Sequence, residues 1–437
     1  MKNRVSFYTL GCRLNQSETA VLERSFEVKG YRVVGFDEPA DIVVVNTCTV
    51  TENGDADTRR IVNKINRINP KARIALIGCQ AQTQKEKLLD LPNVHFVVGN
   101  ARKMDLVEIL FEMSKQPDRV GRGTVITPTI PRDAFTIPIA GIDRHHTRAN
   151  IKIQDGCDFF CSFCEIPYAR GRARSRVFED ILLEARALAA AGHKELVLTG
   201  INLGTYNHEG KTIVDVIDSL ESIAELKRIR ISSIEPTTIP WEIIHKMNVE
   251  AQNSEPLLCR YLHIPLQSGS NHVLQLMQRK YTVEEYSNFI NQIYQSVPQV
   301  GLGTDVIVGF PGETDADFQQ TYELLRELPL AYFHVFSYSQ RTMAKSQNLP
   351  DAVPAKIIAQ RSETLRQLSV RKRILFLQSL IGTKQHVLIE EHKNGFWFGK
   401  TDHFAAIKIR SNKNLSNQII AVELKTIDGQ TIIGCLG

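Results

Sequence analysis

Residues 155–164 read Asp-Gly-Cys-Asp-Phe-Phe-Cys-Ser-Phe-Cys, which places Cys157, Cys161 and Cys164 close together in a Cys-x3-Cys-x2-Cys arrangement. Thiolates bind soft metals and iron–sulfur clusters. Three neighbouring thiolates can hold three corners of a cubane cluster and leave its fourth iron open to another ligand. The alternatives are a zinc site, or buried cysteines that bind nothing. A structural zinc ion normally takes a fourth Cys or His, and the next histidine, His193, is one predicted helix away, so the spacing favours a cluster.

This segment resembles the motif of the radical S-adenosylmethionine (SAM) superfamily in its spacing and in Phe163, directly before the last cysteine. The resemblance implies that Cys157, Cys161 and Cys164 bind a [4Fe–4S] cluster. It further implies that the amino and carboxylate groups of SAM chelate the open iron, with Phe163 beside this cofactor.

Length and composition are those of a globular protein with several domains. The 437 residues suggest about three domains, and 43% hydrophobic with 23% charged residues is ordinary for such proteins. The net charge of +5 permits a polyanionic partner without requiring one. The opening MKNRVSFYTL has no apolar signal segment, and no apolar run approaches membrane length. We therefore expect a cytoplasmic protein without membrane association, whose cysteines are thiols.

Residues 1–115 alternate between strand-like and helix-like segments. Residues 41–46 (DIVVVN) are a continuous apolar run, typical of a strand buried on both faces of a parallel sheet. Helices are expected at 15–29 and 58–68, and further strands at 5–10, 73–77 and 95–98. This order predicts an open parallel α/β sheet with helices on both faces.

Three more cysteines, Cys12, Cys48 and Cys79, each follow a predicted strand of this sheet. Because the carboxyl ends of parallel strands share one edge of a sheet, residues far apart in the chain can converge there. The alternative is three buried cysteines without a ligand, since cysteine is often buried. Their shared position at strand exits favours a second ligand trio.

Residues 116–142 contain several prolines, which interrupt regular structure, and we predict a surface linker there.

Residues 143–373 again alternate between strand-like and helix-like segments. Strands are expected at 150–154, 195–199, 228–232, 261–265, 303–308 and 332–336, and helices at 178–191, 212–224, 271–278, 282–297 and 315–328. Six such units resemble the partial (β/α)6 TIM barrel of radical SAM enzymes, where sites lie at the carboxyl ends of strands.

Small and polar residues follow four of these predicted strands. Glycine lets a backbone approach a ligand, and Ser, Asn and Glu hydrogen-bond ammonium and hydroxyl groups, although turn formation alone explains any single residue. By resemblance, the first segment approaches the SAM amino group, the second and third face the ribose and the reacting nucleoside, and the fourth lies beside the adenine. In that order they contain Thr199, Gly200 and Asn202; Ser232, Ser233 and Glu235; Gln267 and Ser268; and Gly309 and Gly312.

A basic stretch with Arg170, Arg172, Arg174 and Arg176 directly follows the central cysteines. Such a run is usually a solvated surface, but the neighbouring cysteines hold this one near the site. Guanidinium groups suit phosphate and carboxylate contacts. The four arginines are therefore candidate contacts to SAM or to RNA.

A long basic helix is expected at 355–380, across the start of the last predicted domain, residues 374–437. The pattern then changes to short strands with turn signals, at 386–390, 395–400, 405–410 and 418–426. They predict a small β-barrel, which resembles the nucleic-acid-binding TRAM domain. Phe396, Trp397 and Phe398 are candidates for base stacking, with a place in the barrel core as the alternative.

The histidines do not suggest a separate metal site. The only adjacent pair, His145 and His146, lies at the start of the central region, and we interpret it as a continuation of the linker. Cys259 and Cys435 lack partners at metal-ligand spacing, and we interpret both as structural.

Four segments together resemble the methylthiotransferase family over nearly the whole chain. They are TLGCRLNQSET (9–19), NTCTVT (46–51), IGCQAQ (77–82) and DGCDFFCSFCEIPYARGRARSR (155–176). The resemblance implies an auxiliary [4Fe–4S] cluster on Cys12, Cys48 and Cys79, through which sulfur and methyl arrive, with a second SAM donating the methyl. It implies that SAM cleavage at the central cluster yields a 5′-deoxyadenosyl radical that abstracts hydrogen from an unreactive C–H. An electron donor such as flavodoxin or ferredoxin is then expected.

Three segments most resemble the subgroup of this family that acts on threonylcarbamoyladenosine in tRNA: TLGCRLNQSET (9–19), IPYARGRARSR (166–176) and RISSIEP (230–236). This implies methylthiolation at C2 of that nucleoside at position 37, in the anticodon arm. The segment FSYSQRTMAKSQ (336–347) departs from the family pattern. The alternatives are the subgroups that modify isopentenyladenosine-37 in tRNA or an aspartate of a ribosomal protein. A non-catalytic iron–sulfur RNA-binding redox sensor is the alternative from another class, and it leaves the SAM-like strand ends unexplained.

Overall fold

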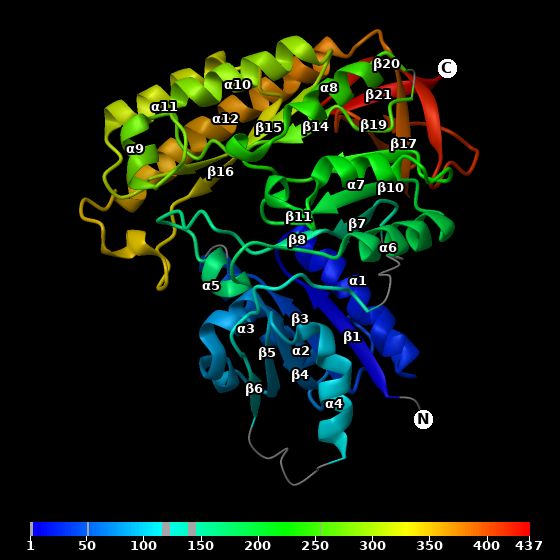
Figure 1. Ribbon diagram of the computed structural model, residues 1–437, viewed down its shortest axis with the longest axis vertical. Coiled ribbons are helices and arrows are strands. Elements are labelled where there is room, and N and C mark those ends of the chain that lie inside the picture. The colour runs from blue at the N-terminus through cyan, green and yellow to red at the C-terminus, as the bar shows by residue number, and fades with distance from the viewer. Residues whose placement is uncertain (1–2, 50–51, 116–122, 139–145, 254) are drawn as a thin grey trace.

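The computed structural model describes residues 3–49, 52–115, 123–138, 146–253 and 255–437. Three parts follow one another along the chain (Figure 1): a blue-to-cyan α/β part, a green-to-yellow α/β part above it, and a red β-barrel beside the latter. This is the fold class that the sequence predicts.

The N-terminal part is a six-stranded parallel sheet with the order β2-β1-β3-β4-β5-β6. Its strands are β1 (Arg4–Thr9), β2 (Arg32–Val34), β3 (Ile42–Thr47), β4 (Arg73–Gly78), β5 (Val94–Gly99) and β6 (Thr124–Ile126). Its helices are α1 (Arg13–Val28), α2 (Glu52–Ile68), α3 (Cys79–Gln84) and α4 (Leu106–Ser114), with 3-10 turns η1 (Lys85–Asp90) and η2 (Lys103–Asp105). Every residue of β3 is buried, as expected for a strand covered on both faces.

The prediction of a linker over residues 116–142 is wrong for part of that range. Strand β6 pairs with β5 and forms an edge of the sheet. The prolines around Thr124-Val125-Ile126 indicate a linker, whereas the β-branched residues of this run favour a strand. Proline is compatible with short edge strands, because an edge strand leaves one side of its backbone unpaired.

The central part contains six parallel strands in the order β7-β10-β13-β14-β15-β16. They are β7 (Ala149–Lys152), β10 (Glu195–Thr199), β13 (Arg228–Ile231), β14 (Tyr261–His263), β15 (Gly301–Val308) and β16 (Tyr332–Ser337). Isolated bridges join the two halves, including Ser233 with His263. The short pairs β8 (Gln154–Asp155) with β9 (Arg174–Ser175) and β11 (Asn207–His208) with β12 (Lys211–Thr212) complete this part.

Helices cover the outer face of these strands (Figure 1). They are α6 (Phe178–Ala190), α7 (Ile213–Leu220), α8 (Trp241–Glu250), α9 (Asn271–Leu276), α10 (Val283–Ser296) and α11 (Asp315–Glu327), with α5 (Ile166–Arg170) before them and the turns η4 (Leu203–Thr205), η5 (Pro236–Thr238) and η6 (Lys345–Asn348). Capping boxes at Thr212, Thr282 and Thr314 start three of the helices. Helix α8, which follows Pro240, was not among the expected helices.

The C-terminal part is a closed barrel with the strand order β17-β18-β19-β21-β20. Its strands are β17 (Lys384–Lys393), β18 (Phe396–Thr401), β19 (Ala406–Ile409), β20 (Ile419–Asp428) and β21 (Thr431–Leu436). The helix α12 (Ala355–Ser379), orange in Figure 1, leads into it from the central part. This continuous helix spans the domain boundary expected at residue 373.

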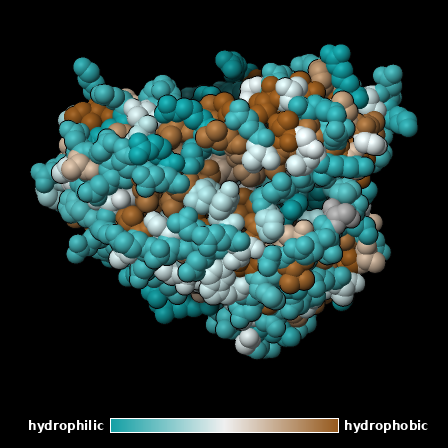
Figure 2. Space-filling model, turned by 90° about the horizontal axis from the view of Figure 1, so that it is seen from above, coloured by the Kyte–Doolittle hydropathy of each residue, from teal (hydrophilic) through white to brown (hydrophobic). Residues whose placement is uncertain are grey.

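The surface seen in Figure 2 is mainly hydrophilic, with hydrophobic residues dispersed among hydrophilic ones. Among the described residues, no helix combines the length and the apolar character needed to cross a membrane.

Candidate active site

Cys157, Cys161 and Cys164 lie together in the loop between β8 and α5, and all three are free thiols. Each sulfur accepts a hydrogen bond from nitrogen: the backbone N–H of Phe159 donates to Cys157 over 3.5 Å, and that of Ile166 donates to Cys164 over 3.4 Å. An Arg279 guanidinium nitrogen lies 3.2 Å from the sulfur of Cys161. Such donors stabilise thiolate ligands, so the trio fits an iron–sulfur cluster.

Without a metal these side chains are held as neutral thiols. Burial raises the pKa of Cys157 to about 11, and it raises the pKa of Cys161 and of Cys164 as well. The Arg279 charge opposes the rise in the pKa of Cys161. Since a bound metal replaces thiol protons, metal binding at this trio releases protons.

Arg279 connects the central trio to the carboxyl end of β13. Its guanidinium group also forms a buried ion pair with Glu235. Burial raises the pKa of Glu235, and the Arg279 charge opposes that rise. Sequence reasoning missed Arg279, because neither its spacing nor its neighbours in the chain indicate contacts to residues 44 and 118 positions away.

The segment expected near the SAM amino group is held by hydrogen bonds within the protein. Gln154 Oε1 accepts the backbone N–H groups of Ile201 and Asn202, and Thr199 donates to the carbonyl of Ile151. Gly200 packs so closely on Gln154 that a Cβ would lie 2.9 Å from its Oε1. Among the described residues, the buried Asn202 Nδ2 has no hydrogen-bond partner, which leaves it available to a ligand.

The second and third segments line the same strand ends. Ser232 continues β13, with its N–H donating to the carbonyl of Leu198, and Ser233 pairs with His263. Gln267 has a left-handed backbone (φ +72°) and bridges to Val306 of β15. Ser268 is buried, and its hydroxyl lies 3.4 Å from that of Thr321. Ser268 is therefore engaged by the protein itself.

The glycine-rich turn after β15 has a packing reason for its glycines. Gly309 and Gly312 both have positive φ, at +79° and +86°. A Cβ on Gly309 would lie 2.3 Å from Ile358 of α12, and one on Gly312 would lie 2.9 Å from Leu276. Phe163 packs beside them in a small apolar cluster with residues such as Phe310. Close packing alone can therefore account for both glycines.

Cys12, Cys48 and Cys79 lie where the sequence predicts, after the adjacent strands β1, β3 and β4. Gly11, directly before Cys12, packs against Cys48: a Cβ on Gly11 would be 2.8 Å from the sulfur of Cys48. The buried Asn100 Nδ2 lies 3.5 Å from the sulfur of Cys79. Three cysteines outside any disulfide at one sheet edge, with a donor beside one of them, fit a second iron–sulfur cluster.

A buried charge network joins the N-terminal sheet to the central strands. Glu18 of α1 pairs with Lys103, Lys152 and Arg170, and Asp155 pairs with Lys152 and Arg170. Burial alone would raise the pKa of Glu18, but the charges of Arg170, Lys103 and Lys152 hold it well below its usual range. Asp155 also pairs with Arg174, so these two carboxylates face four cations, and the excess positive charge beside Cys79 suits an anionic cluster.

We expected the four arginines of residues 170–176 to contact SAM or RNA, but most of their guanidinium groups pair with carboxylates of the protein. Arg170 and Arg176 are fully buried, Arg170 within the network above and Arg176 against Asp180 and Glu184. Arg174 is mostly buried and pairs with Asp155, whereas Arg172 is half exposed beside Asp158. The buried pairs make Arg170 and Arg176 structural, because their guanidinium groups are already occupied by carboxylates.

A second interface contact comes from the segment that departs from the family pattern. Arg341, after β16, is buried and pairs with Asp55 and with Glu165. Its guanidinium group donates to the Thr49 hydroxyl over 2.6 Å. Thr49 directly follows Cys48, and Glu165 directly follows Cys164, so Arg341 connects the two trios.

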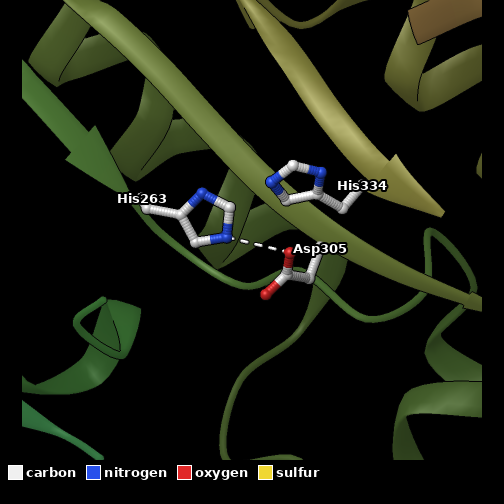
Figure 3. A group of neighbouring side chains, drawn as sticks. All are labelled: His263, Asp305 and His334. Atoms are coloured by element: carbon white, nitrogen blue, oxygen red, sulfur yellow. Dashed lines mark ion pairs between the residues drawn. The ribbon is translucent and has the colours of Figure 1, made fainter. Parts of the chain in front are cut away.

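Two histidines that the sequence does not single out come together with an aspartate in the folded chain. His263 of β14, Asp305 of β15 and His334 of β16 come together on the inner face of the central strands (Figure 3). Their ligand atoms all lie within 4.8 Å of one another, and His263 Nε2 is 2.9 Å from Asp305. His145 lies outside the described residues. Sequence reasoning missed this group because its members belong to three different strands.

Two family models match the chain. The model described as Uncharacterized protein family UPF0004 matches residues 4–99, and the Radical SAM superfamily model matches residues 151–325. These ranges contain the N-terminal and the central cysteine trio respectively.

Curated relatives match over nearly the whole length. The threonylcarbamoyladenosine tRNA methylthiotransferase MtaB of Aquifex aeolicus is 39% identical over 89% of this chain and 93% of its own. The protein of the same name from Bacillus subtilis is 34% identical over 96% and 93%. The tRNA-2-methylthio-N(6)-dimethylallyladenosine synthase of Protochlamydia amoebophila is 31% identical over 98% and 95%.

Solved structures share the fold at low sequence identity. The radical SAM methyltransferase TsrM of Kitasatospora setae matches with a TM-score of 0.55 at 16% identity, over 77% of this chain and 72% of that chain. This likeness supports the arrangement of the strands and says nothing about the substrate.

Proposed function

Because this chain belongs to the radical SAM methylthiotransferase family, we propose that it methylthiolates C2 of N6-threonylcarbamoyladenosine at position 37 of tRNA. The two cysteine trios support the reaction class, since this chemistry needs one site for radical formation and one for sulfur. The relatives named for the threonylcarbamoyl nucleoside, at 31–39% identity, support the choice of substrate.

The central trio and its neighbours have separable roles in this proposal. Cys157, Cys161 and Cys164 hold the first [4Fe–4S] cluster, which when bound supplies the electron that cleaves SAM. Arg279 donates to Cys161 and fixes Glu235, so it positions the end of β13 against the cluster. Asn202 Nδ2, buried and unpaired within the described chain, is a donor for SAM. Thr199, Gly200, Ser233 and Gln267 shape the same strand ends.

The auxiliary trio completes the site. Cys12, Cys48 and Cys79 hold the second cluster, and Asn100 and the excess positive charge of Lys103 and Arg170 stabilise its thiolates. Arg341 and the Glu18 network keep the two trios in a fixed relation. A cytoplasmic flavodoxin or ferredoxin is our proposed source of electrons.

The C-terminal barrel offers a surface for the anticodon arm. Phe396 is partly exposed, with the Lys408 Nζ 5.1 Å and the Arg410 Cζ 4.7 Å from its ring centroid. A stacked aromatic ring flanked by cations suits an unpaired base and its phosphate. Trp397 instead packs against the barrel core and donates to the carbonyl of Ser411.

The observation that carries the proposal is the pair of cysteine trios joined by buried ion pairs. Its test is anaerobic reconstitution of the full chain, followed by incubation with SAM, reductant and tRNA. We expect about eight irons per chain, and a methylthio group on threonylcarbamoyladenosine. Cys48→Ala should lose the product but keep SAM cleavage, whereas Cys161→Ala should lose both.

Other outcomes would redirect the assignment. Product on isopentenyladenosine tRNA, or only on a ribosomal protein, moves the chain to another subgroup. Clusters without any SAM cleavage would instead indicate an iron–sulfur sensor.

A further inference from the structure

A turn of the C-terminal barrel enters the central part at the end opposite the central cysteine trio. Phe404, between β18 and β19, stacks on Tyr261 of β14 with ring centroids 4.9 Å apart. Its φ of +66° is rare for an aromatic residue. A strained backbone persists only where surrounding contacts hold it, and such positions cluster at functional sites.

Four cations surround the Phe404 ring, and they come from all three parts of the chain. The distances from cation to ring centroid are 5.4 Å for Arg13, 5.5 Å for Arg148, 5.2 Å for Arg230 and 4.9 Å for Lys400. Arg373 of α12 is a fifth, since its guanidinium group donates to the carbonyl of Phe404. We call these five cations and Phe404 the Phe404 site.

The carboxylates at this site do not balance its cations. Glu195 pairs with Arg230, and Glu390 pairs with Arg148. In the described part of the chain, Arg13, Arg373 and Lys400 form no ion pair. Arg373 is only 8% exposed, and its Nη1 is buried without a hydrogen-bond partner.

Buried positive charge without a counterion is costly, and proteins keep it where an anion binds. Burial and, after it, the Arg373 charge lower the pKa of Lys400 to about 8, although the Glu390 charge opposes this shift. An anion at this position would remove that cost and occupy the free Nη1 of Arg373 through a charge-assisted hydrogen bond. The Phe404 site therefore has the chemistry of a small-anion site.

The Phe404 site is continuous with the inner face that carries the candidate active site. The Arg373 Cζ is 5.3 Å from the Tyr332 ring centroid, and that ring is 5.2 Å from His334. His334 in turn adjoins His263, whose neighbour Ser233 lies near the expected nucleoside position. His334 is exposed although it lies on a central strand, so solvent reaches this face.

We propose that the Phe404 site binds the carboxylate of the threonylcarbamoyl group, with Arg373 and Lys400 as its cations. This inference rests on the proposed function. Threonylcarbamoyl ends in a carboxylate and a hydroxyl, whereas isopentenyl is neutral and apolar. A set of unpaired cations therefore favours the nucleoside with the threonylcarbamoyl group. It disfavours the isopentenyl nucleoside, because the cations and the apolar group would both lose water without forming an ion pair.

The same charges argue against a metal ion at His263, Asp305 and His334. Arg373 packs on Tyr332, and Tyr332 packs on His334 of this group. The positive charge of Arg373 therefore repels a divalent cation bound there. Imidazole and carboxylate groups at this position can instead hydrogen-bond the hydroxyl and carbamoyl groups of the same substituent.

The test compares two anticodon stem-loop RNAs that differ only at position 37, one with threonylcarbamoyladenosine and one with unmodified adenosine. Full-length, anaerobically reconstituted protein is titrated with each RNA at one salt concentration. We expect Lys400→Met and Arg373→Gln to weaken binding of the modified RNA about tenfold, the effect of one charged hydrogen bond. Binding of the unmodified RNA should stay unchanged. The control Arg186→Gln, on the exposed face of α6, should alter neither.

Each other outcome overturns the inference. Equal weakening for both RNAs would mean that these cations contact backbone phosphates, and unchanged binding would mean that they contact no RNA. A wild-type protein that binds both RNAs equally also contradicts it. The product that the wild type forms distinguishes this inference from the proposed function. If the wild type methylthiolates the modified RNA while the variants bind both RNAs as the wild type does, only this inference fails. Iron content and thermal unfolding of each variant show that it is folded.

Discussion

Some buried cations of this protein form an ion pair with a carboxylate, and others do not. Arg170 and Arg279 lie against Glu18 and Glu235, and removing one partner of such a pair would leave the other charge buried and unpaired. Lys400 has no carboxylate within ion-pair distance in the described chain. Its charge is therefore a cost to the folded protein, which a ligand can offset.

This cost predicts a stabilising substitution. Lys400→Met keeps the packing on Phe404 and removes the buried charge, so we expect the free energy of unfolding at pH 7 to rise by roughly 2 kcal/mol. In wild-type protein the folded-state pKa of Lys400, about 8, lies below that of an unfolded lysine. The wild type should therefore gain stability as the pH rises from about 8 to about 10, and the variant should lack that gain.

Urea unfolding of both proteins at pH 7 and at about pH 10 measures this difference. A variant less stable than wild type at pH 7 would contradict the prediction. It would show that the cation–π contact of Lys400 with Phe404 outweighs the burial of its charge.

Among the elements, α12 has an unusual position because it belongs to two cores. Leu365 and Leu368 pack in the core of the central part, and Leu377 packs in the core of the C-terminal barrel. The Ser369 side chain also hydrogen-bonds the backbone of Phe333 in β16. The helix therefore fixes the barrel relative to the central strands.

The two faces of α12 should respond differently to truncation of a leucine. Leu365 is fully buried and Leu375 is 62% exposed. We expect Leu365→Ala to cost about 2–5 kcal/mol, from lost burial and the cavity left behind. Leu375→Ala is the matched control and should change stability by less than about 0.5 kcal/mol. The shift in the urea midpoint measures both, and equal shifts would contradict this packing.

At the scale of the whole molecule, the C-terminal barrel is part of the central fold and not a separable module. Arg230 donates to the carbonyls of Thr401 and Asp402, and Arg260 forms an ion pair with Asp402 over 2.7 Å. A Cβ on Gly301 of β15 would lie 2.3 Å from the carbonyl of His403. These contacts bury polar groups of both parts in one interface.

Removal of residues 381–437 should therefore destabilise the chain that remains. Arg230 and Arg260 would lose partners inside the protein, and breaking one buried pair costs about 3–5 kcal/mol. We expect a lower thermal unfolding midpoint, together with loss of tRNA binding. Asp402→Asn in the full chain should reproduce part of the thermal effect. An unchanged midpoint after truncation would show that the barrel is an independent module.

Features that depend on neighbours in the chain could be predicted from the sequence alone. The spacing of Cys157, Cys161 and Cys164 needs only one loop, and Cys12, Cys48 and Cys79 each follow a strand whose apolar pattern is visible. Parallel strands expose their carboxyl ends at one edge, so the second trio follows from secondary structure and topology. The three-part fold class follows in the same way.

Only the tertiary structure decided the partners of the buried charges. Glu18 meets Arg170 across 152 residues, and His263 meets Asp305 from another strand. Sequence periodicity records which face of an element is apolar, but it does not record which charge meets which across an interface. The sequence therefore made the arginine run a candidate for contacts to SAM or RNA. In the folded chain its charges at Arg170 and Arg176 are buried, because carboxylates from distant elements surround them.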